Sequence, residues 1–296
     1  MAKKLPFAAL AAVLFLASAC NRDSFEATPP AYFSIRDIKV DQTQYATQGT
    51  AHSEITTAWI FANGQAVGAF ELPAVIPILA DGPTEIEVYP GINMNGIGAT
   101  RSIYIPYSTI RETVNFSALD TASLTSPFTR YSDNAKITLV ENFDESGLNL
   151  SASPRSDTSV IKTNDPAEIF VNPEQTEDNG KAGKIILEGE RNFFELITTE
   201  AYSLPSTGQS VYLEMTYKTE VPIIVGVIAK YSGGVSEQAA TLVVLPAEEW
   251  NKIYVNLISE LTAYPGASGY QIFILGENQD ENNPATVLLD NLKIVY

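Results

Sequence analysis

Residues 55–70 read ITTAWIFANGQAVGAF, and this stretch indicates the fold class of the chain. Every second residue from Ile55 to Phe61 lies on one face of an extended chain, which is the alternation typical of a half-buried β-strand. Asn63-Gly64 follows and supplies the positive φ angles of a tight turn, after which the chain returns to Phe70. The stretch therefore predicts a β-hairpin.

Strand and turn signals continue on both sides of the hairpin, over residues 31–116. Turn pairs occur at Asp81-Gly82, Pro90-Gly91 and Asn95-Gly96, with short apolar runs between them. Nothing in this part of the sequence has sustained helical periodicity. We therefore expect a small β-sandwich over residues 31–116.

Part of this region is similar to a known type of module. The run Trp59–Gly68, followed by Leu79–Gly82 and Glu85–Val88, resembles the PEGA-type or immunoglobulin-like modules of surface proteins. The resemblance implies a domain that serves as a spacer or a packing partner.

The second half of the chain also predicts strands. Residues 117–134 are rich in Ser and Thr and contain Pro127, so we expect them to link two domains. The many strands expected over residues 135–296, with one helical turn at 258–261, suit a two-sheet jelly roll. The predicted strands are 137–143, 184–188, 193–198, 211–219, 223–229, 241–245, 252–257, 270–275 and 287–296. The predicted fold class is all-β: a small Ig-like β-sandwich followed by a two-sheet jelly-roll β-sandwich.

The N-terminus has the pattern of a secretory signal peptide. A basic start, Met1–Lys4, precedes an apolar run that ends at Ala19, and Cys20 follows. The run is shorter than the roughly 20 apolar residues that span a bilayer. Leu16–Cys20 resembles a lipobox, although Ala17 stands where Leu is commonest.

The lipobox resemblance implies that residues 1–19 are removed and that Cys20 carries lipid, such as palmitate. Residues 20–30 then form a polar tether. Asn21 is compatible with transfer of the lipoprotein to the outer membrane of a Gram-negative cell. The sequence does not distinguish the periplasmic face of that membrane from the surface face. The alternative is an ordinary signal peptide with Cys20 as a leftover thiol. Cys20 is the chain's only cysteine, so it has no disulfide partner within the chain.

The charge of the chain limits its partners. The formal net charge is −17, with 35 acidic and 18 basic residues. Removal of residues 1–19 takes away Lys3 and Lys4 and no acid, which leaves −19. Because such a surface repels polyanions, we expect no nucleic-acid partner.

The second domain resembles the jelly rolls of carbohydrate-binding modules. The resemblance is carried by an opening strand at Val140–Asp144, a middle strand at Val211–Lys218, a strand at Glu249–Val255 and the closing strand Leu289–Val295. The closing strand is its most recognisable part. The resemblance implies a polysaccharide partner.

It also implies a structural calcium ion between the opening and closing strands. Glu141 and Asp290 are the positions that match, and Ca²⁺ takes carboxylate and carbonyl oxygens. The alternative is that Asp290 accepts hydrogen bonds from backbone groups. No other cofactor is expected.

Aromatic side chains are the candidates for sugar binding, because the apolar face of a pyranose packs against a ring. Tyr212 alternates with apolar neighbours and so faces outward if they face the core, whereas Trp250 is a platform or a core residue. Tyr231 and Tyr264 lie beside Gly-rich and Pro-Gly loops, where ligands are often bound. Packing or a plain surface position is the alternative for each.

No catalytic constellation is found. The single histidine, His52, lies in the polar segment Gly49–Ser53 and is expected to be an exposed loop residue, so a Ser-His-Asp or Cys-His site is not expected. The acids of Glu141–Glu145 do not have the spacing of a jelly-roll glycosidase.

The sequence thus favours a non-catalytic, lipid-anchored envelope protein that presents a jelly-roll module for glycan binding. The rival hypothesis is a structural lipoprotein that docks another envelope protein. The third is a carboxylate-based enzyme acting on glycans.

Overall fold

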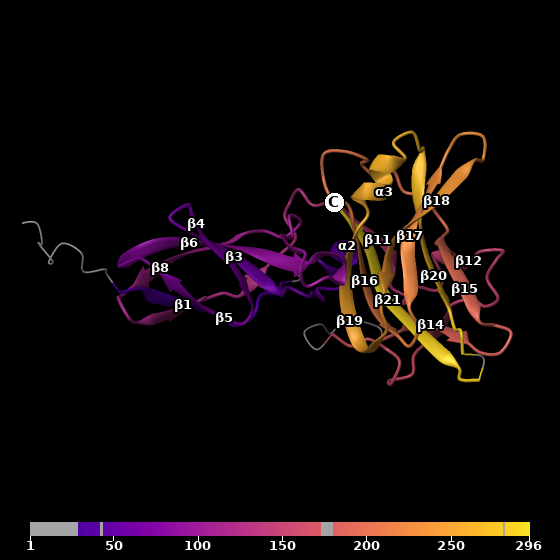
Figure 1. Ribbon diagram of the computed structural model, residues 1–296, viewed down its shortest axis with the longest axis horizontal. Coiled ribbons are helices and arrows are strands. Elements are labelled where there is room, and N and C mark those ends of the chain that lie inside the picture. Colours follow the sequence, from indigo (N-terminus) through magenta and orange to yellow (C-terminus); the bar gives the residue numbers. More distant parts are fainter. Residues whose placement is uncertain (1–28, 42–43, 173–179, 281) are drawn as a thin grey trace, which may run out of the picture.

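The computed structural model describes residues 29–41, 44–172, 180–280 and 282–296. The signal peptide, the lipobox and Cys20 lie outside the described residues. In the described part, two β-sandwiches follow one another along the long axis of the molecule, and helices are few and short (Figure 1). None of the described helices is long and apolar enough to cross a bilayer. The all-β fold class is confirmed.

The first sandwich contains three groups of paired strands. One sheet has the order β5-β1-β9, a second has the order β4-β3-β6-β7 with β8 on β6, and β10 pairs with β2. The bounds are β1 (Ala31–Ile35), β2 (Lys39–Val40), β3 (Thr57–Ala62), β4 (Gln65–Glu71), β5 (Ala74–Ile78), β6 (Gly82–Asn93), β7 (Arg101–Ile103), β8 (Ile110–Phe116), β9 (Thr121–Ser123) and β10 (Phe128–Thr129). The short helices α2 (Tyr45–Gln48) and η2 (Met94–Gly96) lie in its connections.

The predicted hairpin is present as β3 and β4. Asn63 and Gly64 form its turn with φ angles of 48° and 74°. The buried face differs from the expected one: Ala58 and Ile60 are fully buried, whereas Trp59 and Phe61 are only partly buried. The alternation located the strand but not its inner face, since both of its faces are apolar.

Residues 117–134 are not a free connection between domains. Within them, β9 pairs in parallel with β1, and β10 pairs in parallel with β2. Backbone hydrogen bonds therefore make this segment part of the first sandwich, although its Ser- and Thr-rich composition is typical of a linker.

The second domain is a jelly roll of two sheets. The first, here called the interface sheet, has the order β13-β14-β21-β16-β19 with β11 on β21, and the second, here called the free sheet, has the order β12-β15-β20-β17-β18. The interface sheet comprises β11 (Ile137–Glu141), β13 (Ile161–Thr163), β14 (Ala182–Leu187), β16 (Tyr212–Thr219), β19 (Ala247–Asn256) and β21 (Ala285–Val295). The free sheet comprises β12 (Leu150–Ala152), β15 (Phe193–Thr198), β17 (Ile223–Lys230), β18 (Ser236–Val244) and β20 (Gly269–Glu277).

Alternating apolar residues of the two sheets form the jelly-roll core. On β17, for example, Ile223, Val225 and Val227 are fully buried and point inward. Each of the nine strands predicted here overlaps an observed strand, and the expected helical turn is part of α3 (Ile258–Ala263). The short strands β12 and β13 were not anticipated.

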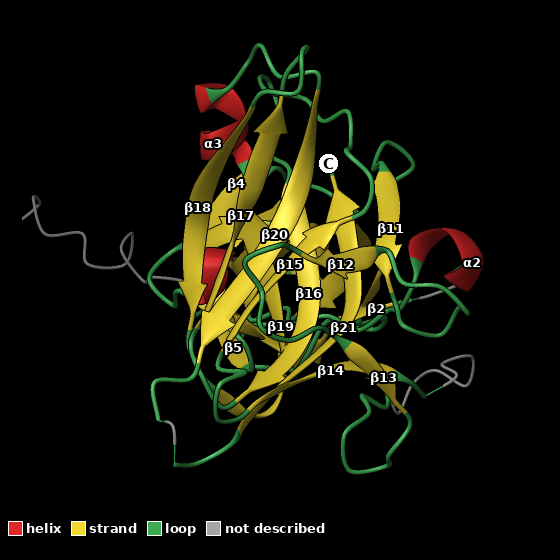
Figure 2. Ribbon diagram, turned by 90° about the vertical axis from the view of Figure 1, so that its right-hand side faces the viewer, coloured by secondary structure: helices red, strands yellow, loops and turns green. Residues whose placement is uncertain are grey.

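Burial differs between the two sheets. From Tyr212 to Tyr217 and from Val287 to Val295 every residue of the interface sheet is buried, so both faces of β16 and β21 are covered. The inner face packs on the core, and the outer face packs on the first sandwich. Figure 2 looks onto the end of the molecule that is far from the first domain. The free sheet faces the viewer there, and no other layer of strands lies in front of it.

Candidate functional site

Three charged side chains lie together on the outer face of the interface sheet. They are Glu214 of β16, Lys252 of β19 and Lys293 of β21, and β16 lies between the other two strands. Glu214 and Lys293 stand directly opposite each other on the paired strands β16 and β21. Leu213 and Met215, on either side of Glu214, point into the core, so alternation places the carboxylate on the outer face. The side chains of Glu214 and Lys252 are 0% exposed and that of Lys293 is 2% exposed. We call these three residues the interdomain charge cluster.

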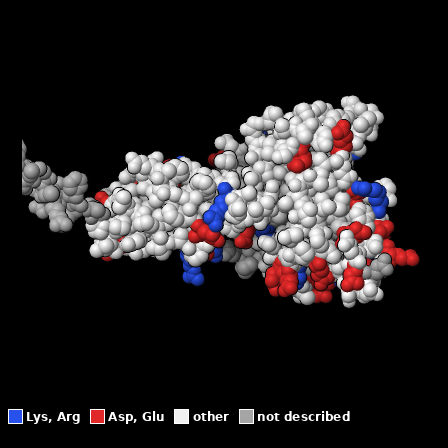
Figure 3. All heavy atoms as spheres, in the orientation of Figure 1, with Lys and Arg blue, Asp and Glu red and all other residues white. Residues whose placement is uncertain are grey.

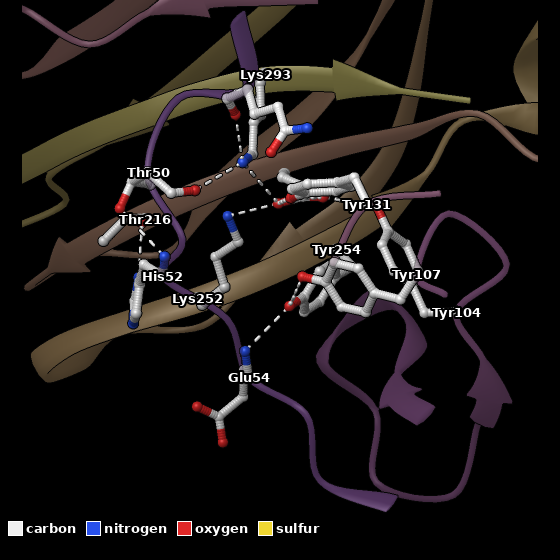
Figure 4. A network of polar contacts seen from close by, with 12 residues as sticks. Thr50, His52, Glu54, Tyr104, Tyr107, Tyr131, Thr216, Lys252, Tyr254 and Lys293 are labelled. Atoms are coloured by element: carbon white, nitrogen blue, oxygen red, sulfur yellow. Dashed lines mark hydrogen bonds and ion pairs between the residues drawn. The ribbon is translucent and has the colours of Figure 1, made fainter. Parts of the chain in front are cut away.

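The first domain completes the contacts of the Glu214 carboxylate. Figure 4 shows Tyr104 and Tyr131 of the first domain close to Lys252 and Lys293 of the interface sheet. The Lys252 Nζ lies 2.8 Å from Glu214 Oε2, and the Lys293 Nζ lies 3.8 Å from it. The Tyr104 hydroxyl donates to Glu214 Oε1 at 2.7 Å, and the Tyr131 hydroxyl donates to Oε1 at 2.8 Å. The carboxylate is thus held by charges from its own sheet and by hydroxyl donors from the first domain.

A layer of tyrosine rings surrounds these hydroxyls. The Tyr104 ring lies 4.9 Å from the rings of both Tyr212 and Tyr254, which belong to the interface sheet, and 4.7 Å from Tyr107 of its own domain. These residues belong to one buried cluster that contains members from both domains. Packing of aromatic rings in this way adds stability beyond that of the buried apolar area, and it excludes water from the charged groups.

The burial of the charge cluster shifts its pKa values. Desolvation raises the pKa of Glu214, but the two lysines and the hydrogen bonds outweigh it and lower the pKa to about 2. Burial lowers the pKa of Lys293 to about 7, although the negative charge of Glu214 acts to raise it. The Lys293 ammonium also donates to the backbone oxygens of Gln48 and Thr50, each at 2.9 Å, and so ties the first domain to β21.

His52 is not the exposed loop residue that the sequence suggested. Its ring lies 4.3 Å from the ring of Phe170, and its Nδ1 is 3.1 Å from the hydroxyl of Thr216 on the interface sheet. Burial and the neighbouring Lys252 lower its pKa to about 3. The segment around His52 is polar because it packs on a polar sheet face, which the local sequence does not reveal.

The four aromatic candidates fall into two groups. Tyr212 is 3% exposed under the first domain, and Trp250 packs edge-on against Phe170 at 5.8 Å, so a sugar would reach the Tyr212 ring only if the domains separated. Tyr231 and Tyr264 are partly buried, pack on the jelly-roll core and lie close enough to each other to interact electrostatically. The fold therefore brings Tyr231 and Tyr264 together but does not join all four in one groove.

The two calcium candidates lie on strands of the interface sheet. Glu141 is 3% exposed, and its oxygens accept the backbone N–H groups of Phe143 at 2.7 Å and Asn149 at 2.5 Å. Asp290 accepts the N–H of Asn291 at 2.7 Å, as the alternative interpretation expected. Within the described residues, no group of three or more His, Cys, Asp or Glu side chains could hold a metal ion. The calcium ion stays a prediction.

The outer face of the free sheet also carries a buried carboxylate, which the local sequence does not indicate. Glu195 of β15 is 2% exposed and lies in one cross-strand row with Leu275 and Ile224. Arg155 donates to both of its oxygens, and the Gln238 amide donates to Oε1 at 2.9 Å. Burial raises the pKa of Glu195, but these hydrogen bonds outweigh it and lower the pKa.

A groove lies beside this row on the same face. Its volume is about 440 Å³, and Phe193, Ile224 and Leu275 form its apolar floor. Gln279 and Asp280 are the exposed polar residues at its rim, and Asp280 accepts the Asn283 amide at 2.7 Å. Asn278 beside them is buried, and its amide donates to the backbone oxygens of Leu187 and Asn283. The groove combines an aromatic ring with amide and carboxylate groups, which suits a polar ligand with apolar faces.

Comparison with known proteins finds similarity in structure only. No protein-family model matches the chain, and no curated protein matches it. The family 30 carbohydrate-binding module of the cellulosomal cellulase Cel9D-Cel44B of Clostridium thermocellum is 14% identical, with 53% of this chain and 96% of that chain covered and a TM-score of 0.37. The family 11 carbohydrate-binding module of Clostridium thermocellum, in complex with a β-1,3-1,4-mixed-linked tetrasaccharide, is 14% identical, with 53% and 94% covered and a TM-score of 0.35.

An enzyme domain is also similar. The enzymatically active domain of bacteriophage CBA120 tailspike protein 4 is 13% identical, with 52% of this chain covered and a TM-score of 0.37, but this chain spans only 20% of its length. The jelly-roll assignment rests on the two stacked sheets described above.

Replacement of Glu214 by Gln tests the charge cluster. The amide keeps an acceptor for the tyrosine hydroxyls but leaves two ammonium groups buried without a counter-charge, so we expect a loss of about 3–5 kcal/mol in the free energy of unfolding. Urea titration at pH 7 measures it. The matched control, Glu85→Gln at an exposed position of β6, should change it by less than about 0.5 kcal/mol. A loss below about 1 kcal/mol for Glu214→Gln would contradict the role of the cluster.

The pKa of Lys293 predicts a pH dependence. Its pKa in the folded protein is about 7, whereas the ordinary pKa of an exposed lysine is 10.5. Between these values the unfolded chain holds a proton that the folded chain has released, so stability rises with pH. We expect the unfolding free energy of the wild type to increase relative to that of Lys293→Met between pH 7 and pH 9.5. Parallel curves for the two proteins over this window would show that Lys293 keeps its ordinary pKa.

Proposed function

We propose that the protein is a non-catalytic, lipid-anchored protein of the outer membrane whose jelly-roll domain binds glycan on its free sheet. The observation that carries the proposal is the arrangement of the two sheets. The first domain covers the interface sheet, and the free sheet lies at the end of the molecule opposite the start of the described chain (Figure 1). A tether at the N-terminus would therefore present the free sheet away from the membrane.

The groove on the free sheet supports a sugar as the ligand. The apolar C–H face of a pyranose packs on a ring such as Phe193, while its hydroxyl groups need both donors and acceptors. The exposed side chains of Gln279 and Asp280, which also line the groove, carry both kinds of group. Figure 3 shows acidic side chains gathered on the lower part of the jelly-roll domain. These charges disfavour an anionic polysaccharide, so the proposed ligand is neutral.

The lipid anchor is supported by the sequence around Cys20. Each buried CH₂ of an acyl chain contributes about 0.8 kcal/mol, so several chains on one terminus hold a protein at a membrane. In this arrangement the first domain serves as a spacer between the tether and the free sheet.

One observation favours docking to another envelope protein instead. The strand β18 forms the edge of the free sheet and pairs only with β17. Val243 and Leu245, at its end, are 52% and 70% exposed. An extended segment of a partner could add to this edge through backbone hydrogen bonds. A stoichiometric protein cross-linked to β18 in intact envelopes, without polysaccharide binding, would favour docking.

Replacement of Phe193 by Ala tests the glycan site. Loss of the ring removes the aromatic part of the apolar floor, and we expect the affinity for the bound polysaccharide to fall about tenfold, which corresponds to about 1.4 kcal/mol. Affinity gel electrophoresis in mixed-linkage β-glucan, galactan, xyloglucan and mannan measures it. Phe128→Ala, at a 49% exposed position of the first domain, should migrate as the wild type does. Two results would count against this site: equal retardation of the wild type and both variants, or no retardation of any of the three proteins.

Replacement of Cys20 by Ser tests the anchor. The variant has no thiol to acylate, so we expect it to enter the aqueous phase in detergent phase separation, whereas the wild type enters the detergent phase. Mass spectrometry of the processed N-terminus should find acyl chains on Cys20 of the wild type. An unmodified thiol there would refute the anchor and leave glycan binding to be judged on its own.

A further inference from the structure

A separate cavity lies where the first domain meets the edge of the interface sheet. Its volume is about 360 Å³, and residues of both domains line it. The first domain contributes Tyr45 and Gly49, and the jelly roll contributes Leu139, Glu141 and Asn291. None of these residues lines the groove on the free sheet. The volume lies at the lower end of the range for small-molecule sites, about 300–1,000 Å³, and domain interfaces are frequent locations of such sites.

Irregularities in two paired strands shape this cavity. The register of β11 on β21 shifts between Leu139 and Glu141, and the register of β21 on β16 shifts near Asn291. Asn291 has a φ of 52°, in the left-handed region that few residues other than glycine adopt. Such a conformation costs about 1–3 kcal/mol and is common at functional sites.

Two buried polar groups line the cavity. Asn291 is 6% exposed, and its side-chain Nδ2 has no hydrogen-bond partner within the described protein. Glu141 is held in place by the N–H groups of Phe143 and Asn149, and a carboxylate has lone pairs to accept further donors. An unpaired buried donor costs free energy, and a ligand that supplies an acceptor would recover it.

The wall from the first domain is fixed in position. Lys293 also borders the cavity, but its ammonium donates to the backbone oxygens of Gln48 and Thr50. Gly49 approaches Leu139 so closely that a Cβ at Gly49 would lie 2.9 Å from Leu139 Cδ2. The cavity is therefore built when the two domains are joined.

We propose that this cavity binds one ring of a neutral sugar. A hydroxyl group donates to one partner and accepts from another, and so it satisfies the Glu141 carboxylate and the Asn291 amide together. Tyr45 and Leu139 supply apolar walls for the C–H face of the ring. An anion is disfavoured by Glu141, because a buried carboxylate repels a second negative charge. This site is independent of the groove on the free sheet.

Saturation-transfer NMR on the full chain tests the proposal, with the methyl glycosides of glucose, galactose, mannose and N-acetylglucosamine as probes. We expect at least one of them to bind the wild type, and Asn291→Gly to weaken that binding about tenfold. Glycine tolerates the left-handed backbone, so this variant removes the amide without straining the chain. Asn63→Gly, which makes the same change at the hairpin turn with a φ of 48°, should bind as the wild type does.

Two further measurements keep the test decisive. Asn291→Asp keeps the size of the side chain but loses the donor, so it should also lose binding. It serves as the second variant if Asn291→Gly proves unstable. Carrying Phe193→Ala in every protein of the series disrupts the proposed glycan groove, so that the remaining signal comes from this cavity. The proposal fails if none of the four glycosides binds, if Asn291→Gly binds as the wild type does, or if glycylglycine displaces the sugar and identifies a peptide site.

Discussion

A carboxylate that is removed from water needs compensating charge and hydrogen bonds, and in this protein the compensation for Glu214 comes from both domains. Lys252 and Lys293 supply the charge from the interface sheet, and Tyr104 and Tyr131 supply hydroxyl donors from the first domain. Neither domain could bury this cluster alone: the jelly roll would expose it to water, and the tyrosines would lose their acceptor. A buried ion pair often contributes little net stability compared with apolar packing, but a broken one is costly. The cluster thus favours one relative placement of the domains.

The placement of the domains determines which surfaces can bind a ligand. The first domain covers the interface sheet, so Tyr212 packs at the domain boundary, and Trp250 packs against Phe170. The free sheet is the large sheet surface of the jelly roll that no other described sheet covers. That surface carries its own buried carboxylate, Glu195, held by Arg155 and Gln238. A jelly roll has two outer faces, and here one packs on the first domain while no other described sheet covers the other.

Much of the fold could be predicted from the sequence, because alternation and turn pairs are local signals. Asn63-Gly64 located the first hairpin, and the alternation from Val211 to Lys218 located β16. The candidate site was harder to predict, since it depends on which layer covers a strand. Glu214 and Lys293 stand at outward positions, where charged residues normally contact water, and 79 residues separate them in the chain. His52 was misjudged for the same reason. One signal was present: Tyr104, Tyr107 and Tyr131 are clustered near the domain boundary, and such residues often cover buried polar groups.

The central claim is that the buried charge cluster joins the two domains into one rigid body. The distance distribution between nitroxide labels on cysteines introduced at Thr113 in the first domain and Thr199 in the jelly roll tests it most directly. Both positions are exposed, and Cys20, the only native cysteine, would be replaced by serine. Double electron–electron resonance should give a single narrow distribution. A broad distribution, or two separate distances, would show that the domains move independently and would contradict the account.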